Sequence, residues 1–257
     1  MIRRIAALRN GGDFTCGTVS EGGFSFVDGR VFAAFGDGVK ITYYLEILSS
    51  WCLWVEPTWL ELKQRYAGRA EFHWKIALMQ PADFPVSLEQ CEWFYRRSGG
   101  TVMRSPFMLN ANWFEAGRKG HYDAPNLVAE AGKDFGFDGD ELRLALSHAA
   151  LREGRKIGGM DEAIAVASKA VGIKPAELRV RAESSDVRAR VDQSTAEFLG
   201  HQINQRPSFI LQDAIGDKVV FSGLVRIEPL AAAIDAMIAD TTAYAAHAVH
   251  HGAVPPI

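Results

Sequence analysis

The stretch that most constrains this chain is an apolar, β-favouring run over residues 41–48 that stops at two serines. A helical pattern of apolar residues follows at about 54–66, so we expect a strand that leads straight into a helix. The first backbone N–H groups of a helix have no partner within it, and with the helix dipole they stabilise an anion in the preceding turn. A thiolate is such an anion. The candidate site is therefore the turn Ser49-Ser50-Trp51-Cys52.

The rest of the chain supplies a familiar order of strands and helices around that turn. Residues 70–78 read as a second strand, which would lie parallel to the first across a βαβ unit. Residues 208–211 and 218–221 predict a hairpin, and an amphipathic helix begins near Glu228. Between these halves, residues 81–186 are almost wholly helical in pattern. We therefore expect an α/β chain with a thioredoxin-like fold, βαβ followed by ββα, and an inserted all-helical domain.

This order divides the chain into three parts. Residues 40–80 and 187–257 would form the thioredoxin-like domain, residues 81–186 the inserted helical domain, and residues 1–39 an N-terminal β-hairpin extension.

The extension has the pattern of short strands at residues 14–19, 24–27 and 30–35, with a hairpin signal at Asp28-Gly29. Small hairpins of this kind commonly cover a sheet edge or contact a second copy of the chain. We expect either an edge cover or a homodimer contact through these hairpins.

Composition excludes several classes of partner. The chain has 257 residues, 48% of them hydrophobic, and a net charge of −3, which favours neither nucleic acid nor an anionic membrane surface. No apolar run approaches the roughly 18–20 residues of a membrane span, and the N-terminus lacks the apolar core of a signal peptide. The three cysteines, Cys16, Cys52 and Cys91, are widely spaced and odd in number, which is not a disulfide framework. We expect a cytoplasmic protein.

Several segments together resemble one family. Residues 51–57, Trp-Cys-Leu-Trp-Val-Glu-Pro, lie over the second half of the pattern C-P-W-C-Y-(I/L)-G-x-P, and residues 149–157 resemble its inserted-domain segment. Residues 205–210 are similar to the loop that holds a cis-proline before a strand, and Gly223 matches the glycine before the last helix. Over about residues 40–240 the chain resembles the DsbA-like proteins of thioredoxin fold, in the branch of FrnE-type oxidoreductases, 2-hydroxychromene-2-carboxylate isomerases and kappa-class glutathione transferases.

The resemblance has a chemical consequence at Ser49, which stands where the disulfide-exchange members carry their first cysteine. A serine cannot form a disulfide, so a dithiol cycle within this motif is excluded. The isomerases and kappa-class transferases carry a serine there, and by resemblance its hydroxyl hydrogen-bonds the thiol of bound glutathione and favours the thiolate. The resemblance thus implies an isomerase or transferase that uses glutathione or another low-molecular thiol. Its small organic substrate would bind in the cleft between the sheet and the helical domain.

Two alternatives stay open at this stage. Cys52 could act as a monothiol whose pKa the helix N-terminus lowers, or it could be a small buried hydrophobe. The chain could also be a catalytically decayed binding or scaffold protein, with Ser49 serving only as a helix cap. The pKa of Cys52 discriminates, because a value near or above the ordinary ~8.5 favours the non-catalytic alternative.

Further residues complete the predicted site beside Ser50 and Trp51. Glu46 could be a buried carboxylate that relays protons, or an ordinary strand-end residue. By resemblance Pro207 is cis and is followed by Ser208 in the thiol-binding loop, and Arg206 could clamp a carboxylate or phosphate or lie solvated on that loop.

Aromatic residues and histidines form two further groups. Four tryptophans could line an apolar pocket or belong to the core: Trp51, Trp54, Trp74 and Trp113. The tail histidines His247, His250 and His251 have helical spacing but no acidic or cysteine partner nearby, so we expect no metal site.

Overall fold

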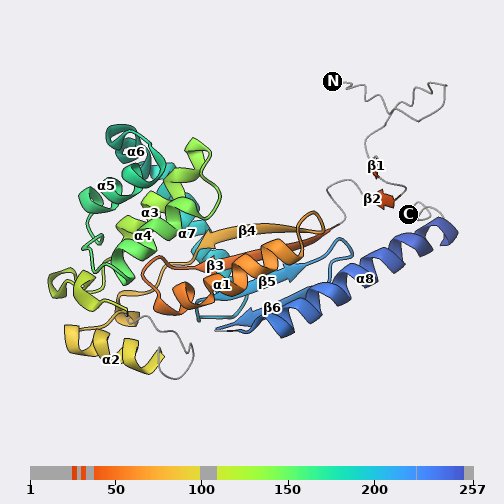
Figure 1. The fold of residues 1–257 in the computed structure, drawn as a ribbon, viewed down its shortest axis with the longest axis horizontal. Helices are drawn as coiled ribbons and strands as arrows, with labels where there is room; N and C mark the ends of the chain where they lie inside the picture. Colours follow the sequence, from red (N-terminus) through yellow and green to blue (C-terminus); the bar gives the residue numbers. More distant parts are fainter. Residues whose placement is uncertain (1–24, 28–29, 33–37, 99–108, 224, 252–257) are drawn as a thin grey trace.

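The computed structural model describes residues 25–27, 30–32, 38–98, 109–223 and 225–251 (Figure 1). Its centre is a four-stranded sheet in the order β4-β3-β5-β6. Strand β3 (Val39–Leu45) runs parallel to β4 (Ala70–Ile76) and antiparallel to β5 (Ser208–Gln212), which pairs antiparallel with β6 (Lys218–Ser222). The predicted βαβ and ββα halves are therefore confirmed, and they share one sheet.

Helices cover both faces of this sheet. Neighbouring residues of a strand point to opposite faces, and Tyr43 stacks on Phe209 at 5.0 Å between centroids beneath helix α1 (Ser50–Arg65). Helix α8 (Ile227–His251) lies on the same side, where Ala231 accepts a hydrogen bond from the hydroxyl of Tyr66, the residue that caps the end of α1. On the other face Tyr44 packs against Phe198 of helix α7 (Ser185–Gly200).

The inserted helical segment gathers at one end of the sheet (Figure 1). Its helices are α2 (Leu88–Ser98), α3 (Asp123–Gly132), α4 (Glu141–Leu151), α5 (Met160–Val171) and α6 (Pro175–Ala182), with short 3-10 turns η1 (Pro81–Asp83), η3 (Ala111–Trp113), η4 (Ala116–Arg118) and η5 (Lys133–Phe135). Gly172 ends α5 with a left-handed φ of 78°, and Pro175 opens α6. The division into three domains stays a prediction; its boundary at residue 187 falls in the first turn of α7.

One expectation about an element end is wrong. The strand expected over residues 41–48 ends at Leu45, and residues 46–49 form a turn in which the N–H of Ser49 bonds the carbonyl of Glu46 at 3.1 Å. Ile47 and Leu48 are apolar because that turn is buried, not because they continue the strand. At the other end of the chain, α8 continues through the tail histidines to His251, because the preceding segment is rich in alanine, the best helix former.

The N-terminal extension is described only in part. Strands β1 (Ser25–Val27) and β2 (Arg30–Phe32) pair antiparallel as a separate two-stranded sheet, which confirms the hairpin predicted there. The strand expected at residues 14–19 lies outside the described residues. The edge cover and the homodimer stay predictions. Among the helices that the structure describes, none is both long and apolar enough to cross a bilayer.

Candidate active site

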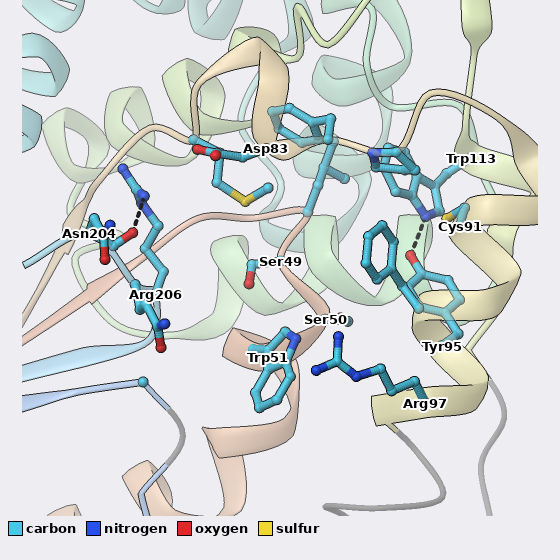
Figure 2. A pocket seen from close by; sticks show the side chains of 17 residues that line it. Ser49, Ser50, Trp51, Asp83, Cys91, Tyr95, Arg97, Trp113, Asn204 and Arg206 are labelled. Atoms are coloured by element: carbon cyan, nitrogen blue, oxygen red, sulfur yellow. Dashed lines mark hydrogen bonds between the residues drawn. The ribbon is translucent and has the colours of Figure 1, made fainter.

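The turn before α1 opens onto a cavity of about 450 Å³ (Figure 2). Three parts of the chain surround the cavity. One is the turn itself with the start of α1, the second is the loop before β5, and the third is α2 with the short helices around it. Predicted site residues from the first two parts therefore meet there, and the inserted helical segment supplies the opposite wall.

Ser49 is the N-cap of α1. Its backbone is extended (φ −76°, ψ 115°), and its hydroxyl oxygen accepts a hydrogen bond from the backbone N–H of Cys52 at 3.3 Å. A hydroxyl that accepts one bond can still donate its own proton. Ser49 is buried but lines the cavity, so it can cap the helix and still donate to a guest.

Ser50 and Trp51 are the first two residues of α1, and both line the cavity as predicted. Their backbone N–H groups belong to the first turn, where no carbonyl of the same helix is available as an acceptor. The Trp51 side chain is 37% exposed, whereas Ser50 is buried. The N-terminus of α1 thus presents a hydroxyl, backbone donors and an aromatic side chain to one space.

Cys52 lies outside the lining of this space and is only 3% exposed. Burial raises the pKa of its thiol to about 12, although the hydrogen bond with Ser49 acts in the opposite direction. Of the two alternatives for Cys52, this pKa disfavours the monothiol activated by the helix N-terminus, since desolvation outweighs the stabilising contacts. The role of Cys52 as a catalytic monothiol stays a prediction, and its burial favours the alternative that it packs in the core.

Glu46 is almost completely buried behind the Ser49 turn. One carboxyl oxygen accepts the backbone N–H of Leu48 at 2.9 Å, and the other accepts the side-chain amide of Asn126 at 2.6 Å. Burial raises the pKa of this carboxyl to about 7, while these two donors and the charge of Arg206 lower it. A group with that pKa can gain or lose a proton near neutral pH. Glu46 does not itself line the cavity, so its role as a proton relay stays a prediction.

The Arg206–Pro207 bond is cis, as the resemblance implies. Arg206 lines the cavity, but its guanidinium donates to the backbone carbonyls of Ala77 (2.7 Å), Leu78 and Asn204 (3.0 Å). It is therefore not the solvated arginine that the sequence allowed, because three carbonyls hold it, whereas its role as a clamp for a carboxylate or phosphate stays a prediction.

Ser208 does not contribute to the cavity wall. It is fully buried at the start of β5, and its hydroxyl donates to the carbonyl of Gln205 at 2.6 Å. The expectation that it faces a bound thiol is therefore corrected. Ser208 pairs with Tyr44, so its side chain points to the face of the sheet that α7 covers.

The wall supplied by α2 was largely missed from sequence. Cys91 and Tyr95 lie one helical turn apart and line the cavity together with Trp113, whose indole N–H donates to the Tyr95 hydroxyl at 2.6 Å (Figure 2). Burial raises the pKa of Cys91 to about 11. Of these three residues only Trp113 was predicted as a possible pocket residue, and the i, i+4 spacing of the other two was the available signal. Trp54 and Trp74 belong to the core.

The arrangement can be compared with known proteins. At the level of sequence, neither a family model nor a curated protein matches the chain. Solved structures do match. One is a Nitrosomonas europaea protein provisionally named a protein disulfide isomerase, with TM-score 0.65, 14% identity, and 79% of this chain and 99% of that one covered. Another is Pseudomonas aeruginosa DsbA, with TM-score 0.54, 12% identity, and coverage of 87% and 94%. The fold is that of the DsbA-like thioredoxin proteins.

A third DsbA-like match is a 2-hydroxychromene-2-carboxylate isomerase, with TM-score 0.55, 14% identity, and 80% of this chain and 98% of that one covered. The expected thioredoxin-like fold with an inserted helical segment is therefore confirmed. Identities this low carry the DsbA-like fold alone and assign no activity to the chain.

Proposed function

We propose that this chain is an enzyme of thiol chemistry that binds a low-molecular thiol, such as glutathione, at Ser49. The observation that carries the proposal is the capping hydroxyl of Ser49 at the wall of a cavity of about 450 Å³. A thiolate there would meet a hydroxyl donor and the positive end of α1. One protein with the same fold is named an isomerase, which is compatible with the proposal.

The second substrate would be a small organic molecule between the sheet and α2. Aromatic and apolar side chains make up much of that wall, among them Phe84, Phe94 and Trp113. The thiolate would attack an electrophilic carbon of this substrate and form a C–S bond, while the displaced electron pair passes to a leaving group or into an opened conjugated double bond. In an isomerase that bond breaks again and the thiolate returns, whereas in a transferase the sulfur stays in the product.

One observation favours a second candidate, a binding protein that keeps the fold without the chemistry. Burial raises the pKa of Cys52 to about 12, well above the ordinary ~8.5 of a thiol, and a thiol that stays protonated is a poor nucleophile. The Ser49 route does not need this thiol, because the attacking sulfur would come from the bound ligand. The two candidates therefore differ in whether the cavity binds a thiol.

Titration calorimetry of glutathione against the full chain tests the proposal. We expect Ser49→Ala to weaken binding by about tenfold or more, because a hydrogen bond to a charged group is lost. Cys52→Ala is the matched control and should bind as the wild type does, since that thiol lies outside the cavity. Absence of binding by the wild type would leave the binding-protein candidate, and loss of binding in Cys52→Ala alone would favour the monothiol.

A further inference from the structure

We infer that Asn126, which α3 contributes from the inserted helical segment, is a positioning residue that holds the Glu46 carboxyl and the turn that delivers Ser49 to the cavity. The inference rests on the proposed function only for its effect on a bound thiol. Its effect on Glu46 can be measured without any ligand.

Asn126 is 1% exposed, and each end of its amide is hydrogen-bonded. The side-chain oxygen accepts the backbone N–H of Ile47 at 3.1 Å. The side-chain nitrogen donates to Glu46 Oε1 at 2.6 Å and to the carbonyl of Tyr122 at 3.3 Å. A buried amide with both ends engaged fixes the geometry of the groups it touches.

The bonds to Ile47 and Glu46 fall on the turn that precedes α1. Its three successive N–H groups are all bonded: Leu48 and Ser49 to Glu46 itself, and Ile47 to Asn126. Two of these bonds are therefore internal to the turn, and the third comes from a helix about 80 residues further along the chain. Asn126 is the point at which the helical segment acts on the position of Ser49.

The same amide acts on the charge of Glu46. An N–H donor stabilises the ionised carboxyl and so opposes the effect of burial. Four other charged or titratable groups interact electrostatically with Glu46. They are Arg206 in the loop before β5, Asp123 of α3, Cys52 of α1 and Tyr95 of α2. Asn126 differs from all of them because it contacts the carboxyl directly and does not titrate.

A purely structural role makes a different prediction. If Asn126 only filled space at the junction of the helical segment and the sheet, its replacement would lower stability and leave the pKa of a folded Glu46 unchanged. The pKa of Glu46 therefore separates the two roles.

The experiment is a carbon-13 NMR titration of the glutamate carboxyls in the full chain, with the Glu46 signal assigned by its absence in Glu46→Gln. Asn126→Leu keeps the branching at Cγ and removes the donor, so we expect the pKa of Glu46 to rise by about 1. Asn126→Asp keeps the shape and places a second carboxyl beside the first, so the pKa should rise at least as far. It also preserves the test if Asn126→Leu does not fold.

The matched control is Glu130→Gln, a buried residue on the same helix that pairs with Lys133 and Arg190. It should leave the pKa of Glu46 as in the wild type. A Glu46 pKa that is unchanged in the folded Asn126 variants would overturn the inference. If the wild type binds no glutathione, the proposed function fails and this titration still decides the role of Asn126. If it does bind, the Asn126 variants should bind more weakly.

Discussion

Glu46 shows how one residue can link the core to the site. Its carboxyl lies under the turn of Ser49, fully enclosed, and is held by donors from Leu48 and Asn126 rather than by a charged partner in contact with it. Arg206 lowers its pKa through its charge, but the Arg206 donors are directed to backbone carbonyls. Burial therefore outweighs every stabilising contact, and the pKa of the carboxyl comes to lie near neutral pH.

The raised pKa of Glu46 makes the stability of the folded chain depend on pH. The pKa of Glu46 is about 7 in the folded chain against an ordinary value of 4.5, so the folded state holds the proton more tightly than the unfolded state does. The stabilisation is fully present below the unfolded pKa and is lost as the pH rises through the folded pKa. Relative to Glu46→Gln, the free energy of unfolding of the wild type should fall by about 3 kcal/mol over that range.

Urea denaturation at a series of pH values measures this difference. The comparison is between the slopes of the two curves against pH, because the Glu46→Gln variant need not match the wild type in absolute stability. Parallel curves would mean that Glu46 titrates normally in the folded chain.

At the scale of elements, α1 and α4 are joined by a buried ionic network. Arg143 of α4 is 3% exposed and makes a bidentate pair with Glu56 of α1, at 2.6 and 2.9 Å, and a second pair with Asp140 at 2.6 Å. Tyr43 donates to Glu56 and to the carbonyl of Cys52, both at 3.1 Å. The helical segment therefore contacts α1 as well as the turn that precedes it.

Breaking this network should be costly. Arg143→Met leaves Glu56 without its buried cation, and removal of one partner of a buried pair typically costs about 3–5 kcal/mol. Chemical denaturation should show a loss of that size, and the double variant Arg143→Met, Glu56→Leu should recover part of it. Lys174→Met breaks an exposed pair with Glu177 and should change stability little. Equal effects of Arg143→Met and Lys174→Met would contradict the account.

The hydrogen bonds of Asp140 could not be predicted from the sequence around it. Asp140 precedes α4, where an aspartate commonly caps a helix, but its side chain makes no capping bond and instead accepts from Trp59, Lys63 and Arg143. A cap is a local signal within a few residues, whereas these partners are up to 81 residues away.

For the molecule as a whole, the spacing of apolar runs was enough to predict the thioredoxin-like frame. The βαβ and ββα patterns depend on local periodicity, and so does the cap at Ser49. The cavity wall from α2 and the hydrogen bonds of Asn126 to the turn before α1 depend on how the inserted segment folds back onto the sheet. No local sequence pattern encodes that. Arg206 was misjudged for the same reason, since its partners Ala77 and Leu78 follow a distant strand.

If the frame is that of a thioredoxin, restoring the missing thiol should restore a dithiol motif. Ser49→Cys would place a second thiol at the N-cap of α1, three residues before Cys52. We expect mild oxidation to join the two in a disulfide, seen by mass spectrometry as the loss of two hydrogens, and we expect insulin reduction to rise above that of the wild type. The wild type itself should not catalyse insulin reduction. Failure of Ser49→Cys to form the disulfide would place the two positions too far apart for this frame.

The most direct test of the central claim is the pKa of glutathione bound to the wild type, followed through the ultraviolet absorbance of its thiolate. If the Ser49 turn stabilises a thiolate, this pKa should lie at least about 1 below that of free glutathione in the wild type and in Cys52→Ala. It should return toward the free value in Ser49→Ala. A bound thiol that titrates as it does in free glutathione, or one whose pKa is the same with and without the Ser49 hydroxyl, would contradict the account.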